Sequence, residues 1–362
     1  MATFLVAGPA FAQCAPDPTA ANSTTTCAGT DTDGLSVTTF NTRVIVASGA
    51  IVQPGSATAA ITSNSSSAVF QVDGLIDGGA GKAGLFVTTA APFTTVCVDP
   101  YAGASVNYCT PGSTYTTYPS SSANVSIAQG GRITGAQGIL LRRDPSNTSG
   151  YVSASIDNAG TITGTAGPAI LMDPSAGIGS MSITNRATGL IGGISGAVSY
   201  ITNAGTIDGG NIAALASSVQ GTNVINTGRI VSNGQATTLS SIGFLYVNNA
   251  ADAVIGGSTT AINTSGALSL VNAGTINGSV ISTAGSGFGS TIDTRLGIIN
   301  GNLTLGAGND TLRARYDAAT GRIASITGTV DGGAGSDTLA FGVDADAVFT
   351  RAVLPTNFEL FG

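Results

Sequence analysis

Ile201-Thr202-Asn203-Ala204-Gly205-Thr206-Ile207-Asp208-Gly209 is the stretch of sequence that decides the fold, because versions of it recur along most of the chain. Each version has an aliphatic residue, a polar residue two positions later, and an Ile four or six positions after that. The polar residue is Gln129 in the first copy and then Asn158, Asn185, Asn203, Asn226, Asn249 and Asn272. Successive copies are 29, 27, 18, 23, 23 and 23 residues apart, as expected for one turn of a solenoid per copy.

Each copy predicts two short strands that are joined by a tight corner. Aliphatic and polar residues alternate with the period of two that is typical of strands, and Asn-Ala-Gly offers residues that accept a left-handed backbone. One copy alone cannot bury its aliphatic pair. Stacked at about 4.8 Å per layer, the copies bury a column of Ile and Val and bring the six Asn side chains into a ladder. The sequence therefore predicts an all-β fold, a parallel β-helix or β-solenoid.

The composition of the 362-residue chain agrees with this fold and excludes one class of partner. The chain has 52 Gly but no His or Trp, and only 9% of its residues are charged. Its apolar fraction of 42% argues against a disordered chain. Nucleic-acid binding requires clustered Lys and Arg, whereas the net charge here is −7. We therefore expect no nucleic-acid partner.

The N-terminal residues and the cysteines predict export. Residues 1–12 form an apolar run that ends in Ala-Phe-Ala, which we interpret as the remnant of a signal peptide cleaved after Ala12. Four cysteines allow three pairings, and the cost of loop closure favours the local one, Cys14 with Cys27 and Cys97 with Cys109. Disulfides imply an oxidising compartment. Zinc is disfavoured because the chain has neither His nor a Cys-x-x-Cys spacing.

The rest of the chain divides into three parts. We expect residues 13–85 to form less regular capping turns, residues 86–122 an inserted disulfide loop, and residues 123–362 the regular turns. The insertion carries the candidate ligand-binding residues Tyr101, Tyr108, Tyr115 and Tyr118. Inserted loops in solenoids project from one face, where Tyr can contact sugars or proteins. The alternative is a loop that only covers an apolar flank.

Two Gly-rich motifs near the end of the chain contain the candidate metal ligands, Asp310 and Asp337. They are Leu305-Gly-Ala-Gly-Asn-Asp-Thr-Leu312 and Gly332-Gly-Ala-Gly-Ser-Asp-Thr-Leu339. The second matches the repeat of calcium-binding β-rolls, in which Gly-rich turns and Asp present oxygen ligands. The alternative is a pair of ordinary Gly-Asp corners, because the motif is not repeated in tandem. Calcium is the one cofactor that the sequence brings into consideration.

The sequence predicts a protein without catalytic residues. The lack of His excludes a Ser-His-Asp triad, and no Gly-x-Ser-x-Gly motif is present. A polysaccharide hydrolase or lyase would need two carboxyl groups at a defined separation, and the pattern defines no such pair. The densest acidic cluster comprises Asp310, Asp331, Asp337, Asp344 and Asp346. A polysaccharide-processing β-helix and a calcium-binding secreted β-roll protein remain the alternative functions.

The combination of motifs resembles the passenger region of bacterial autotransporters. The matching residues are the Asn-Ala-Gly-Thr-Ile units that begin at Asn158, Asn203 and Asn272, the run 305–312, and the closing Asn357-Phe-Glu-Leu-Phe-Gly362. The resemblance implies a right-handed β-helix exposed at the outer membrane or secreted by a Gram-negative bacterium, where it acts in adhesion, cell aggregation, biofilm formation or virulence. Implied partners are host, neighbouring-cell or abiotic surfaces, glycans and further copies of the chain. It also implies an outer-membrane β-barrel after residue 362, so we expect this chain to be a fragment.

Overall fold

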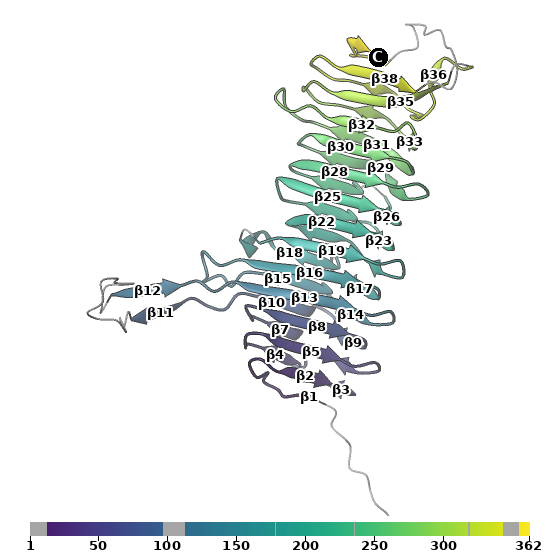
Figure 1. Cartoon of the computed structure of the whole chain (residues 1–362). Helices are drawn as coiled ribbons and strands as arrows, with labels where there is room; N and C mark the ends of the chain where they lie inside the picture. Colours follow the sequence, from purple (N-terminus) through teal and green to yellow (C-terminus); the bar gives the residue numbers. More distant parts are fainter. Residues whose placement is uncertain (1–12, 97–112, 178, 235, 318, 343–354) are drawn as a thin grey trace, which may run out of the picture.

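The computed structural model describes residues 13–96, 113–177, 179–234, 236–317, 319–342 and 355–362. These residues form an elongated stack of coils that advances from the N-terminal to the C-terminal end of the chain (Figure 1). Each regular coil contributes strands to three parallel ladders, so that the stack has three long faces. The predicted parallel β-helix is confirmed.

One face is a 16-stranded sheet, sheet A, whose strands follow one another in chain order. Most neighbours pair in parallel, whereas β1 on β2 and β36 on β35 are antiparallel. Sheet A consists of β1 (Cys14–Ala15), β2 (Thr24–Cys27), β5 (Thr42–Val46), β8 (Ala68–Val72), β13 (Ser121–Ile127), β16 (Val152–Asn158), β19 (Met181–Asn185), β22 (Val198–Asn203), β25 (Gly221–Asn226), β28 (Phe244–Asn249), β30 (Leu268–Asn272), β32 (Thr291–Asp293), β35 (Thr311–Asp317), β36 (Arg322–Ile323), β38 (Thr338–Gly342) and β39 (Leu360–Phe361).

The other two faces belong to a 21-stranded sheet, sheet B, which consists of two ladders. The ladder that follows sheet A in each coil contains β3 (Thr30–Asp31), β6 (Ile51–Val52), β9 (Leu75–Asp77), β14 (Arg132–Gly135), β17 (Thr161–Gly164), β20 (Leu190–Ile191), β23 (Thr206–Asp208), β26 (Arg229–Val231) and β33 (Ile298–Asn300). The next contains β4 (Leu35–Val37), β7 (Ala59–Ser63), β10 (Ala83–Thr88), β15 (Ile139–Arg142), β18 (Ile170–Met172), β21 (Ile194–Gly196), β24 (Leu215–Ser217), β27 (Leu239–Ser241), β34 (Leu303–Thr304) and β37 (Val330–Asp331). Both ladders share β29 (Val254–Thr264) and β31 (Thr275–Ser282).

Helices contribute almost nothing to the described residues. Their one helix is a 3-10 turn, η1 (Pro174–Ala176), which begins after Asp173. Within the part of the chain that the structure describes, no helix has the length and apolar character needed to span a membrane. The Gly-rich, Lys-poor composition accounts for this, because Gly disfavours helices and Val and Ile favour strands.

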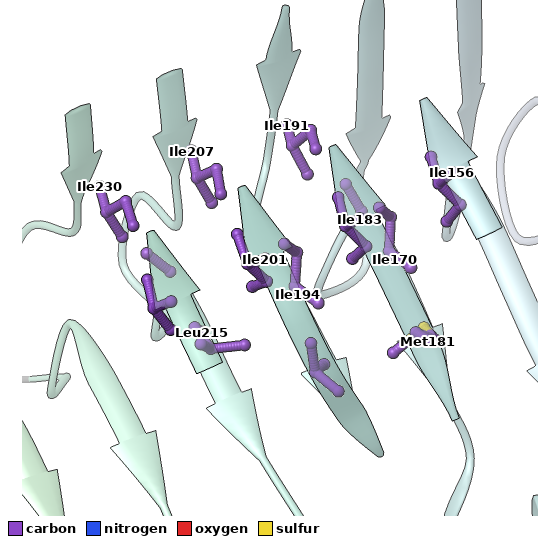
Figure 2. Packing of buried hydrophobic residues seen from close by; sticks show 14 of the residues in the cluster. Ile156, Ile170, Met181, Ile183, Ile191, Ile194, Ile201, Ile207, Leu215 and Ile230 are labelled. Carbon is purple, nitrogen blue, oxygen red and sulfur yellow. The ribbon is translucent and has the colours of Figure 1, made fainter. Parts of the chain in front are cut away.

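The core is a set of aliphatic columns that run along the stack. In the first ladder of sheet B, from β9 onward, the residues at one register position are all fully buried isoleucines: Ile76, Ile133, Ile162, Ile191, Ile207, Ile230, Ile255, Ile276 and Ile299. Sheet A presents a second column to the same interior, and Figure 2 shows Ile156, Ile183 and Ile201 from it. Each coil buries its aliphatic residues against the coils before and after it, which one repeat alone could not do.

The first predicted copy of the repeat is wrong in register. Ile127, not Gln129, pairs with Asn158 in sheet A, and the Gln129 side chain is exposed. The Ile column is nevertheless continuous, because Ile133 pairs with Ile162. The corner between Ile127 and Ile133 is two residues longer than the corner between Asn158 and Ile162. Ile127 therefore occupies the position of the Asn residues, and the amide ladder begins one coil later.

The expectation of a left-handed backbone at the Asn-Ala-Gly corners is also wrong. Positive φ occurs at other glycines and at four non-Gly residues, but not at the ladder Asn residues or at Gly160, Gly205 and Gly274. Glycine is required there by close approach of the preceding coil. A Cβ at Gly205 would lie 2.3 Å from the carbonyl oxygens of Arg186 and Gly189, far inside van der Waals contact.

An antiparallel strand covers the N-terminal edge of sheet A. β1 pairs with β2, and a disulfide joins Cys14 to Cys27, which are direct partners in this pairing. The backbone N–H of Cys14 also donates to the Asp31 carboxylate at 3.1 Å. The strand occupies an edge at which the unpaired backbone groups of β2 would otherwise be open to pairing with another chain.

Candidate functional site

The inserted segment contains a two-stranded arm that projects sideways from the stack (Figure 1). Its strands, β11 (Phe93–Val96) and β12 (Thr114–Thr117), pair antiparallel and form a separate sheet. Phe93 and Tyr115 are 54% and 52% exposed, and Val96 and Tyr118 are also exposed. The arm therefore presents aromatic and aliphatic side chains to solvent. The predicted site residues Tyr101 and Tyr108, and the predicted disulfide of Cys97 and Cys109, lie outside the described residues.

One buried amide fixes the root of the arm. The Asn147 side chain is fully buried and donates to the carbonyl oxygens of Ala90, at 3.0 Å, and Pro119, at 2.7 Å. These two residues lie just before and just after the arm, so one side chain holds both of its ends. Asn147 Oδ1 in turn accepts the backbone N–H of Gly150 at 2.6 Å. Because the amide is buried and fully bonded, the arm leaves the stack from a defined position.

The second pair of candidate residues, Asp310 and Asp337, forms part of a column of carboxyl groups at the C-terminal end of sheet A. The Asp310 carboxylate accepts a hydrogen bond from the backbone N–H of Ser290. The Asp337 carboxylate accepts one from the backbone N–H of Asp310 at 2.7 Å, and the Glu359 carboxylate accepts one from the backbone N–H of Asp337 at 2.8 Å. The side chains of Asp310 and Asp337 are buried, and one oxygen of each, Oδ2, has no hydrogen-bond partner. The column thus links the last coils through backbone groups.

The surroundings of these two carboxyl groups disfavour their charged forms. Burial raises the pKa of Asp310, and the nearby Asp337 carboxylate raises it further, against the lowering effect of the Ser290 N–H. Burial likewise raises the pKa of Asp337, with Glu359 and Asp331 adding to the effect. Among the described residues, no group of three or more acidic or cysteine side chains is placed so that it could hold a metal ion. The arrangement favours binding of a proton by the column.

We expect Asp310→Asn to stabilise the protein at pH 7 by about 1 kcal/mol, because an amide removes a buried, incompletely paired charge. The raised pKa means that the folded state binds protons more readily than the unfolded state. The charged Asp310 side chain therefore destabilises the folded state fully at a pH above its raised pKa. This destabilisation fades as the pH falls toward 3.8, the ordinary pKa of an Asp side chain. Thermal unfolding from pH 7 to pH 4 should show the gain of the variant shrinking with acidity.

The exposed corner residue Asp252 provides the control for this measurement. Asp252 has a positive φ of 64°, which Asn tolerates well, so Asp252→Asn should leave the stability at pH 7 unchanged. A lower stability of Asp310→Asn at pH 7 would contradict the interpretation. If added calcium stabilised the wild type but not the variant, the carboxyl group would instead be a calcium ligand.

The remaining acidic candidates are described in part. Asp331 accepts the backbone N–H of Gly333 at 3.0 Å and the side-chain amide of Asn357 at 2.7 Å. This is the behaviour of an Asp residue that stabilises a turn. Asp344 and Asp346 lie outside the described residues.

The six predicted Asn residues form a buried amide ladder along one corner of the stack. Each Nδ2 donates to the Oδ1 of the next Asn at 2.8 to 2.9 Å, from Asn158 through to Asn272. Asn272 donates to Thr294 Oγ1, which ends the ladder. Toward the N-terminus the same register position is aliphatic, with Ile127, Val72 and Val46. The ladder is thus a polar segment within an otherwise apolar column.

The pattern of the repeats conceals one further group of exposed residues. Tyr200 and Tyr246 each directly precede the aliphatic residue of a repeat, a position occupied by Ser or Asn in the other Asn-containing copies. Both point outward from sheet A. Comparing this one position across all copies would have revealed them.

Comparison of the chain with models of protein families, with curated proteins and with solved structures finds no match.

Proposed function

We propose that this chain is a non-catalytic, surface-displayed β-helical stalk that acts in adhesion, cell aggregation or biofilm formation. The observation that carries the proposal is the arm, which presents Phe93, Val96 and Tyr115 to solvent at the side of a long stack. Exposed aromatic residues are the side chains that most often anchor protein contacts. Exposed apolar groups that gather on one element mark interaction sites more often than single ones do.

The architecture supports a role in which position matters. A stack held together by parallel ladders resists bending at every coil, because each strand is hydrogen-bonded to its neighbours on both sides. The arm leaves this stack at a root that Asn147 ties from both ends. A partner surface that contacts the arm would therefore meet it at a constant distance from either end of the described stack.

Export to an oxidising compartment is part of the proposal. The buried Cys14–Cys27 disulfide supports it, since disulfides persist mainly outside the cytoplasm. Display at the outer membrane or cell surface of a Gram-negative bacterium, through a C-terminal outer-membrane domain, rests on the resemblance to autotransporter passengers. The proposed partners are host, neighbouring-cell or abiotic surfaces and the glycans on them.

Removal of the arm tests the proposal. In the variant, residues 91–118 are replaced by Gly-Gly, which keeps Ala90 and Pro119 at the root. We expect latex beads coated with this variant to lose most of their binding to epithelial cells and to polystyrene, and to aggregate less. The stack buries its core without the arm, so the melting temperature should change little.

Point substitutions distinguish the contribution of the arm's exposed side chains to binding from the contribution of the arm as a whole. Phe93→Ser with Tyr115→Ser should reduce bead binding about tenfold or more, since contact anchors carry most of the binding energy. Phe40→Ser is the matched control, because Phe40 is 57% exposed but lies on another coil. Unchanged binding of the arm-deleted beads, or equal losses in the Phe93/Tyr115 and Phe40 variants, would overturn the role of the arm.

A further inference from the structure

Sheet A carries a charge-free strip on its outer face. The outward positions of the five strands β19, β22, β25, β28 and β30 hold only Gly, Ser, Thr, Asn, Tyr, Phe, Ile and Val. At one end the strip meets Asp157 of β16, which pairs with Arg186 at 2.6 Å. At the other it meets Asp293 of β32, which pairs with Arg295 at 2.7 Å. Ion pairs thus bound a neutral strip, and the five strands that carry it follow one another along the stack (Figure 1).

Two tyrosines and an asparagine lie in register along this strip. Tyr200 pairs with Asn223, and Asn223 with Tyr246, so the two rings are two layers apart, or roughly 10 Å. Tyr200 is 39% and Tyr246 51% exposed. Within the described part of the chain, the hydroxyl groups of Tyr200 and Tyr246 make no hydrogen bond. The side-chain amides of Asn223 and Asn248 make none either. The strip therefore offers apolar ring surface and free polar groups alternately.

We propose that this strip binds an extended, neutral, β-linked polysaccharide whose chain runs parallel to the long axis of the stack. Sugar rings have apolar C–H faces and a rim of hydroxyl groups, so each ring requires both kinds of contact. Tyr rings supply the apolar contact and a polar tip, and the Asn amide can both donate to and accept from sugar hydroxyls. An extended β-1,4-linked chain repeats every second sugar, which is close to the two-layer separation of Tyr200 and Tyr246.

The absence of charged side chains on the strip favours a neutral polysaccharide over an acidic one. An acidic polysaccharide would need cationic partners, and the outward positions of the strip provide none. The second outward row adds Ile225 and Val271, separated by Asn248. The two rows therefore alternate apolar and polar groups along the axis. The centre of a typical protein interface is instead a continuous apolar patch, so the strip fits a repeating polymer better than a second copy of the chain.

The inference rests on the proposed function only in assigning the chain a binding role, and it places the glycan contact on sheet A rather than on the arm. The two sites lie on different coils, so one can be removed without altering the other. Loss of the arm would abolish surface adhesion and leave glycan binding intact, whereas loss of the tyrosines would do the reverse. Failure of either proposal is thus distinguishable from failure of the other.

The test is retention of the protein by three insoluble or cross-linked polymers: cellulose, chitin and the acidic polymer pectate. We expect the wild type to bind at least one of the two neutral polymers and not pectate. The double variant Tyr200→Ala with Tyr246→Ala should bind at least about tenfold more weakly. Tyr151→Ala is the matched control, since Tyr151 is 44% exposed but lies outside the strip, and it should bind as the wild type does.

Each other result would overturn the proposal. No retention of the wild type on cellulose or chitin would remove the neutral glycan as ligand, and stronger retention on pectate would reverse the charge argument. Equal weakening in Tyr151→Ala would show that the strip is not the site. If the double variant instead converted a dimer to a monomer in sedimentation without altering glycan binding, the strip would be a contact between copies of the chain.

Discussion

Asn226→Leu is expected to destabilise the stack by about 3 kcal/mol, because it interrupts the amide ladder in its middle. Asn226 Nδ2 donates to Asn249 Oδ1 at 2.8 Å, and Asn226 Oδ1 accepts from Asn203 Nδ2 at 2.8 Å. Leu has nearly the same shape, so little cavity energy enters. The loss arises from two broken ladder bonds, from the Asn249 oxygen, which is left buried without its donor, and from the amide's hydrogen bonds to the backbone of Gly228 and Val254. Urea unfolding followed by circular dichroism measures it.

Asn158→Leu is the control, because Asn158 is the first member of the ladder. Its neighbour toward the N-terminus is Ile127, so only one ladder bond, that to Asn185, is broken. Both variants also lose the amide's hydrogen bonds to backbone groups at the corner. We therefore expect a smaller loss than in Asn226→Leu. If both variants lost the same stability, the cost would come from each residue's own corner rather than from the ladder.

The apolar half of this column allows a second test of how the amide ladder contributes to stability. Val46, Val72 and Ile127 occupy the same register position without any amide. Aliphatic residues are thus compatible with the corner, and the cost of a substitution lies at the junction between an amide and an aliphatic neighbour. Replacing all six Asn residues by Leu should therefore cost much less than six times the loss in Asn226→Leu, a strong departure from additivity.

The parts of the fold that could be predicted are those that each repeat encodes locally. The Ile column and the Asn ladder follow from alternation and from spacing along a single copy, and both are present in the structure. The register of the first copy could not be predicted, because a corner that is two residues longer leaves Gln129 in the place where Asn is expected. Corners vary in length without changing the strands, so spacing alone does not determine the register there.

The candidate sites depended on residues from different coils and were therefore harder to predict. Tyr200 and Tyr246 are far apart in sequence, and only the coil-to-coil register brings them onto one strip. In the same way, Glu359 joins the column of Asp310 and Asp337 through strand pairing that no local motif reveals. The insertion was recognisable from its composition, but its antiparallel strands and the clamp by Asn147 were not.

Gly205→Ala is expected to cost about 3 kcal/mol or more, the range of severe overpacking, because the new methyl group would meet backbone atoms on the preceding coil. Its Cβ would lie 2.3 Å from two carbonyl oxygens, those of Arg186 and Gly189, and 2.9 Å from Asn185 Nδ2. Backbone carbonyls in a paired coil cannot move aside as the end of a flexible side chain can. The coils would have to separate at this corner, which would also weaken the hydrogen bond between the side-chain amides of Asn185 and Asn203.

Gly221→Ala distinguishes this mechanism from a general intolerance of Ala in place of Gly. A Cβ at Gly221 meets no atom within 4 Å, and Gly221 does not have a positive φ. Ala also restricts the unfolded chain, so this variant should be neutral or slightly stabilised. Equal melting temperatures for the two variants would contradict close approach as the reason for Gly205. A selective loss in Gly205→Ala would mean that the Gly of each Asn-Ala-Gly corner sets the separation of the coils, and with it the geometry of the amide ladder beside it.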